Sequence, residues 1–164
     1  MNEVALSLEE HMTKVEKSLM LRRGRWIADF NESFRNFRVR ELEFDVFIRG
    51  NTRERGFLLS RVFSILLNPN YEVGCFMMST ESIKHFDRKF IGKALAEIQS
   101  YMKDNEMKWS WLFIFTTREI DAIKKYIENI RDQSIGVVLV DTKSRNVIHS
   151  NSYLGRQAKG YIKL

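Results

Sequence analysis

The chain lacks most of the residues that several common kinds of site require. Cys75 is the only cysteine among 164 residues, which excludes an internal disulfide and a cysteine-rich zinc site. Its apolar neighbours in the stretch VGCFMM predict a buried thiol rather than a nucleophile. The three histidines are far apart, and none has a metal-ligating residue three or four positions later. We therefore expect no zinc site.

Other sequence signals for common functions are also missing. The stretch Arg49-Gly50-Asn51 has one glycine where a P-loop or a dinucleotide fingerprint needs several, and no serine lies in a nucleophile elbow. No uncharged apolar run approaches the roughly 18–20 residues that span a bilayer. The acidic N-terminal sequence, MNEVALSLEEHM, does not resemble a secretory signal. We expect no membrane partner and a cytoplasmic location.

What the chain does contain is aromatic residues and positive charge. Twelve Phe, five Tyr and three Trp, with a single proline, are typical of a packed globular domain. The net charge is +6 and the pI is near 9.5, which favours acidic partners, DNA or RNA above all. A basic surface that only keeps the protein in solution is the alternative.

A strand–helix–strand pattern over residues 109–150 indicates the fold class. The stretches WSWLFIFTT and IGVVLVD are apolar on both faces, which is typical of the middle of an α/β sheet. The amphipathic helix between them, which Thr116 and Glu119 are predicted to cap, provides the crossover of a parallel pair. We predict an α/β fold with a mixed four- to five-stranded sheet, helices on both faces and a helical N-terminal extension.

The N-terminal part reads as helical. A capping box of Ser7 and Glu10 opens one helix. A second apolar stripe follows, so either one helix kinks near Gly24 or two helices meet there. The stripe consists of Trp26, Ile27, Phe30, Phe34 and Phe37. We place a boundary near Arg38, which gives a helical extension (1–38) and an α/β core (39–164) within one domain.

At residue 39, where the core begins, the spacing of the apolar residues changes from a helical to a strand-like period. Residues 39–48 and 71–78 fit strands, and the residues between them, 53–67, fit a helix. Thr80 is predicted to cap a long helix that carries Phe86 and Tyr101 on its apolar face. The tail after residue 151 has no clear period.

Carboxylates offer the only route to catalysis. Asp45 and Glu43 share one face of a predicted strand, and Glu72 opens the next strand. If Asp45 and Glu72 lie at adjacent strand ends, they can hold a Mg²⁺ ion for phosphodiester hydrolysis. The alternative is that Glu43 and Asp45 form the solvated face of an edge strand.

Two groups of cations are candidates for nucleic-acid contact. Four of them share roughly one side of the helix predicted from Thr80, where phosphate can bind. These are Lys84, Arg88, Lys89 and Lys93. In the tail, cations alternate with tyrosines that can stack on bases. These are Arg156, Lys159 and Lys163, with Tyr153 and Tyr161. Solvated faces without a partner are the alternative for both groups.

The sequence from Lys93 to Ile148 resembles the C-terminal half of restriction-endonuclease-like domains of the PD-(D/E)xK superfamily, of the Mrr type. In that family a strand carrying E-x-K precedes a helix like the one at residues 86–101. A strand, a helix and a last strand ending in "V-D" follow, as VVLVD does here. The resemblance implies a nuclease-like fold, with Asp45 as the family aspartate, Glu72 as the second acid, and Lys84 or Lys89 replacing the missing lysine.

This chain departs from the family at the E-x-K motif. The corresponding stretch is Phe76-Met77-Met78-Ser79, and Glu72-Val73-Gly74 has no lysine. We therefore expect a nucleic-acid-binding protein with a degenerate, inactive nuclease site. If it is active, it is a metal-dependent nuclease that uses Asp45, Glu72 and Lys89. The alternative is a non-enzymatic interaction or regulatory protein, a homodimer through its aromatic N-terminal helices.

Overall fold

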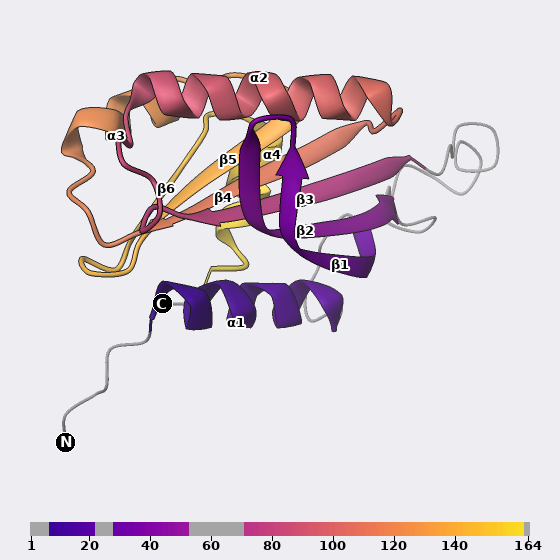
Figure 1. The fold of residues 1–164 in the computed structure, drawn as a ribbon, viewed down its shortest axis with the longest axis horizontal. Coiled ribbons are helices and arrows are strands. Elements are labelled where there is room, and N and C mark those ends of the chain that lie inside the picture. The colour runs from indigo at the N-terminus through magenta and orange to yellow at the C-terminus, as the bar shows by residue number, and fades with distance from the viewer. Residues whose placement is uncertain (1–6, 22–27, 53–70, 163–164) are drawn as a thin grey trace.

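The computed structural model describes residues 7–21, 28–52 and 71–162, which form one mixed sheet with helices on both faces (Figure 1). Strands β1 to β6 lie side by side in sequence order. Strands β1, β2 and β3 are antiparallel, β3, β4 and β5 are parallel, and β6 runs antiparallel to β5. The predicted α/β class and mixed sheet are confirmed, with six strands rather than four or five.

Within the described part of the chain, four helices accompany the six strands. In chain order the elements are α1 (Leu8–Met20), β1 (Ala28–Val39), β2 (Leu42–Thr52), β3 (Glu72–Ser79), α2 (Arg88–Asp104), β4 (Trp109–Thr116), α3 (Asp121–Glu128), β5 (Ile135–Asp141), β6 (Asn146–His149) and α4 (Tyr153–Lys159). Among the described residues, no helix is long and apolar enough to cross a membrane.

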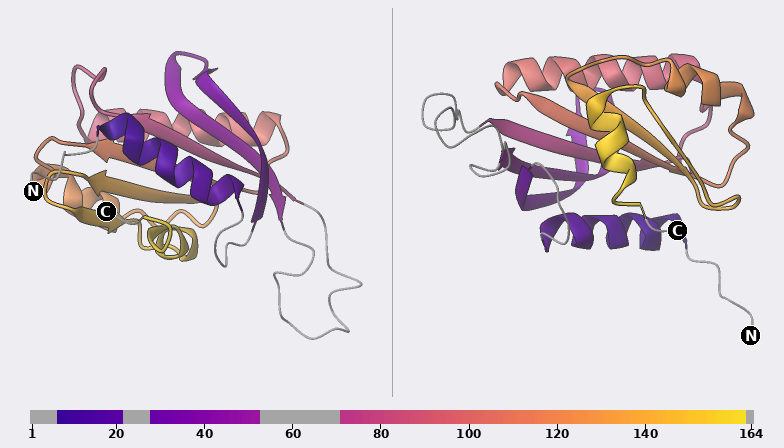
Figure 2. Two further views of the ribbon diagram at one scale, coloured as in Figure 1. Left: turned by 90° about the horizontal axis from the view of Figure 1, so that it is seen from below. Right: turned by 180° about the vertical axis from the view of Figure 1, so that it is seen from behind.

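The sheet separates two apolar clusters. One face packs against α1 and α4, and the other packs against α2 and α3 (Figure 2). Every residue of β5, and every residue of β4 after Trp109, is buried, as the two-sided apolar patterns predicted. Cys75 is fully buried in the first cluster, and this burial raises the pKa of its thiol. The prediction of a buried thiol is confirmed.

The N-terminal region is only partly helical. The capping box of Ser7 and Glu10 is present and opens α1, whose buried face lies on the sheet. The prediction of a second helix is wrong, because residues 28–39 form β1. The boundary predicted near Arg38 falls close to the turn between β1 and β2. Trp26 and Ile27 lie outside the described residues.

A β-bulge explains why the strand β1 resembled a helix. The pairing with β2 shifts between Phe30 and Glu32, so residues after the bulge exchange faces. Phe30 therefore packs beside Trp111 on the α1 face, whereas Phe34 and Phe37 stack on Phe47 on the opposite face. Their spacing matches one side of a helix, but the bulge moves Phe34 to the opposite face of the sheet. The alternation breaks again at Asn36, whose φ is 51°, and this leaves Phe37 on the same face as Phe34.

Two predicted helix starts are also wrong. Helix α2 begins at Arg88, with Asp87 as the residue whose side chain accepts from the amide of Phe90. Thr80 is instead buried at the end of β3 and donates to Thr116, at 2.8 Å. The side chain of Thr116 does not cap α3. The helix predicted over residues 53–67 lies outside the described residues, and α4 was not expected.

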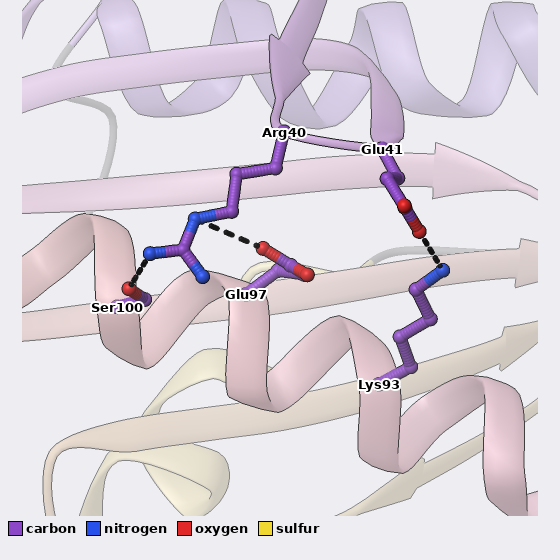
Figure 3. Close-up of polar contacts among 5 residues, drawn as sticks. All are labelled: Arg40, Glu41, Lys93, Glu97 and Ser100. Atoms are coloured by element: carbon purple, nitrogen blue, oxygen red, sulfur yellow. Dashed lines mark hydrogen bonds and ion pairs between the residues drawn. The ribbon is translucent and has the colours of Figure 1, made fainter.

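The β1–β2 hairpin reaches across to α2 (Figure 3). Its turn consists of Arg40 and Glu41, and Arg40 has the positive φ, 51°, that tight hairpin turns favour. Glu41 pairs with Lys93 at 2.6 Å. Arg40 pairs with Glu97 at 3.7 Å and donates to Ser100 at 2.5 Å. These contacts hold the beginning of β2 near the helix.

Candidate functional site

The carboxyl ends of the three parallel strands share one edge of the sheet, the edge where α/β proteins commonly bind ligands. The beginning of β2 lies at the same edge, because β2 is antiparallel to β3. A pocket of about 340 Å³ lies between this part of β2 and the loop from β3 to α2; we call it the Asp45 pocket. It is lined by Leu42, Glu43, Asp45, Met78, Ser79, Ser82, Ile83, Lys84, His85 and Phe90.

Asp45 occupies the point where β2 separates from β3. The last paired residues there are Val46 and Met77, and the amide of Ser79 donates to Oδ2 of Asp45 at 2.6 Å. The carboxylate thus accepts the hydrogen bond that a backbone carbonyl of β2 would accept if the pairing with β3 continued. Within the described residues, this carboxylate makes no second hydrogen bond, and the side chain is half-buried. One of its oxygens can therefore accept from a ligand.

The charged side chains of the pocket come from two segments, the carboxylates from β2 and the cations from the loop between β3 and α2. Strand β2 contributes the carboxylates of Asp45 and Glu43, the latter exposed and 3.5 Å from Arg38. The loop contributes Lys84 and His85, both exposed and without an ion pair in the part of the chain that the structure describes. The same lining also includes buried or half-buried apolar side chains. These are Leu42, Met78, Ile83 and Phe90.

Asp45 and Glu72 do not converge. Glu72 opens β3 and pairs with Asn51, whereas Asp45 lies beside the other end of β3. Six strand residues correspond to about 20 Å, so the two carboxylates cannot share a metal ion. The Arg49 guanidinium contacts both oxygens of Glu72, at 2.5 Å and 2.7 Å, and Glu72 raises the pKa of Arg49. Glu72 is therefore already neutralised within the fold.

The four cations predicted to share a helix face have different surroundings. Lys84 lies in the loop before α2, so it is not part of that face. Arg88 donates to the carbonyl of Ala122 at 3.2 Å, and Lys93 pairs with Glu41. Among the described contacts, Lys84 and Lys89 make no ion pair, but only Lys84 lines the Asp45 pocket. Of the two lysines proposed to replace the family lysine, Lys84 is thus the one near Asp45.

The second predicted basic patch coincides with α4. Arg156 and Lys159 are exposed there, and Arg156 donates to Asn151 at 3.2 Å. Tyr153 is 48% exposed, whereas Tyr161 packs against the apolar cluster under α1. Tyr161 is thus not positioned as an open stacking surface. Lys163 lies outside the described residues.

A second pocket of about 340 Å³ lies farther along the same edge, between α3 and the β5–β6 hairpin; we call it the Asp141 pocket. Its ionisable residues are mostly acidic: Glu119, Asp121, Lys124, Glu128 and Asp141. Asp141 accepts from the amides of Lys143 and Ser144, at 2.9 Å and 3.2 Å, and from the Ser144 hydroxyl. Its carboxylate is therefore used to form the hairpin turn.

Neither pocket offers a ready metal centre. Among the residues that the structure describes, no group of three or more His, Cys, Asp or Glu side chains is placed to hold a metal ion. Sequence reasoning did not identify Ser82 and His85 as pocket residues, since a loop has no period. Their position directly after an apolar strand was the one available signal.

A comparison of the chain with protein-family models, curated proteins and solved structures gives no match. The chemistry of the Asp45 pocket must therefore be interpreted from its own residues.

Proposed function

We propose that this protein binds nucleic acid through a nuclease-like α/β fold and does not cut the strand that it binds. The observation that carries the proposal is the composition of the Asp45 pocket. It combines a strand carboxylate, a loop lysine and a histidine at the ligand-binding edge of the sheet. The order of elements from β3 to β6 is also the order that the resemblance to PD-(D/E)xK domains implies.

The same pocket argues against cleavage. The resemblance implies an E-x-K motif on the strand beside the aspartate, but Met78 and Ser79 are the β3 residues beside Asp45. A thioether and a hydroxyl do not supply the carboxylate that Mg²⁺ needs there. Without a held metal ion, the pocket has no evident means to activate water or to stabilise the charge of the phosphoryl transition state.

A salt titration combined with a cleavage assay tests this function. We expect labelled DNA to bind with an affinity that falls linearly with salt on a double-logarithmic plot, because phosphate contacts release counterions. We expect no cleavage of duplex or single-stranded DNA with Mg²⁺ or Mn²⁺. No binding to any nucleic acid would show that the function is wrong. Metal-dependent cleavage that is lost in Asp45→Ala would show that the site is active.

A further inference from the structure

The Asp45 pocket is polarised in a way that restricts its ligand. Its β2 side offers hydrogen-bond acceptors, Asp45 and Glu43, and its loop side offers the cations or donors Lys84 and His85. A simple anion would be attracted to the loop but repelled by β2, and a simple cation would experience the reverse. The favoured ligand has hydrogen-bond donors at one end, negative charge at the other, and an apolar body between them.

We propose that the Asp45 pocket binds one unpaired nucleotide of a single strand, with the base toward Asp45 and a phosphate at Lys84 and His85. This proposal rests on the proposed nucleic-acid binding and specifies which part of the nucleic acid the pocket takes. A nucleotide of adenine, guanine or cytosine has the required order of groups, since its base carries an amino donor and its phosphate carries the charge.

The size of the pocket argues for a single nucleotide. Ligand pockets for small molecules span roughly 300–1,000 Å³, and this one, at about 340 Å³, is at the small end. A base in a duplex directs its pairing edge at its partner, so that edge becomes available only when the base is unpaired or extruded. The pocket is too small for a duplex but suits one exposed base.

Asp45 gives the pocket a preference among bases. Its Oδ2 is fixed by the amide of Ser79, so the carboxylate has a defined orientation and one oxygen left to accept. Carboxylates accept from exocyclic amino groups such as N4 of cytosine. Thymine and uracil have no exocyclic amino group, and their one ring donor, N3–H, lies between two carbonyl oxygens that a carboxylate repels. The pocket therefore favours a base with an amino group over thymine or uracil.

The apolar residues that line the pocket can contact the face of a base. Phe90 is half-buried at the beginning of α2, and Met78 is buried at the end of β3. Aromatic and apolar side chains that sandwich an extruded base commonly provide much of its binding energy. Lys84 is exposed and makes no ion pair within the described residues, so its ammonium group can contact a phosphate.

The test compares two labelled oligonucleotides of equal length, oligo-dC and oligo-dT, by fluorescence anisotropy. We expect the full-length wild-type protein to bind oligo-dC about tenfold more tightly, the discrimination typical of one good base contact. Asp45→Asn should remove this preference, because an amide can donate as well as accept. Asp141→Asn is the matched control in the other pocket and should keep it.

A competition experiment tests the same idea without any variant. Deoxycytidine monophosphate should displace the labelled oligo-dC from the wild-type protein, and thymidine monophosphate should do so about tenfold less well. Equal affinity for the two oligonucleotides, or a preference that persists in Asp45→Asn, would overturn the proposal. Duplex binding with no preference among bases would overturn this proposal alone. No binding of any nucleic acid would overturn the proposed function as well.

Discussion

The two pockets at the carboxyl edge of the sheet are alike in size and position but differ in what their aspartates do. Each has a volume of about 340 Å³ and one aspartate from a strand. Asp141 is buried and accepts three hydrogen bonds from its own hairpin turn, whereas half-buried Asp45 accepts one from the amide of Ser79. The carboxylate of Asp141 therefore has a structural role, whereas the carboxylate of Asp45 keeps an oxygen that can accept a hydrogen bond from a ligand.

Neighbouring charges reinforce this difference. The Asp141 pocket gathers three further carboxylates, with Lys124 as the only Lys or Arg among its described lining residues, so it repels phosphate. The lining of the Asp45 pocket contains Lys84 and His85 together with two carboxylates, which leaves both signs of charge for a ligand. A cavity of suitable volume is therefore not enough to identify a site, because the free bonding capacity of its side chains must also be considered.

The largest expected effect concerns stability. We expect Asp141→Ala to lower the free energy of unfolding by about 2–3 kcal/mol, because hydrogen bonds to a charged group are lost from a buried position. For a chain of this size that corresponds to a fall in Tm of roughly 4–12 °C. Asp45→Ala removes a single hydrogen bond and should cost about 1 kcal/mol. Thermal and urea unfolding of both variants measure the two costs.

The contrast between the two aspartates is wrong if Asp45→Ala lowers the free energy of unfolding more than Asp141→Ala does. That result would mean that Asp45 is the structural carboxylate and that its second oxygen does not bind a ligand. Asp45→Asn is a useful companion, because the amide oxygen can still accept from Ser79 and should keep most of the stability.

The next effect concerns nucleic-acid affinity. We expect Lys84→Glu to weaken DNA binding about tenfold and to lower the slope of the salt dependence by about 1, since one phosphate contact is lost. Lys124→Glu makes the same charge change in the Asp141 pocket and should leave the affinity nearly unchanged. Equal losses in the two variants would indicate that only the total charge matters and that DNA does not use the Asp45 pocket.

The sequence could predict the centre of the sheet because its signal there is local. Residues 109–116 and 135–141 are apolar at nearly every position, and burial on both faces is the main explanation for such a strand. Strand β1 could not be recognised in the same way. The bulge after Phe30 moves Phe34 to the opposite face, and a bulge has no reliable sequence signal.

The candidate site was predictable only in parts. Asp45 and Lys84 were singled out from residue type, and the structure brings them to one pocket. Pairing Asp45 with Glu72 failed because it required the register of β2 against β3, which residue type does not encode. His85 entered the site through a loop that folds back toward β2, and such tertiary proximity cannot be derived from periodicity.

The smallest expected effect is that of divalent ions. We expect Mg²⁺ at millimolar concentration to raise Tm by less than about 1 °C, since a stabilising ion must bind the folded state with a dissociation constant below its concentration. In the Asp45 pocket, Glu43 lies near Arg38, and Lys84 lines the same pocket as both carboxylates, so a cation there would meet positive charge. In the Asp141 pocket, the best-placed carboxylate is occupied by the amides of Lys143 and Ser144. Differential scanning fluorimetry with Mg²⁺, Mn²⁺ and EDTA measures the shift.

A clear rise in Tm that disappears in Asp45→Asn would place a metal ion beside Asp45 and favour the active-nuclease alternative. A rise that disappears in Asp141→Asn would mean that the two pockets have exchanged roles, with the turn carboxylate rather than the strand carboxylate serving a ligand.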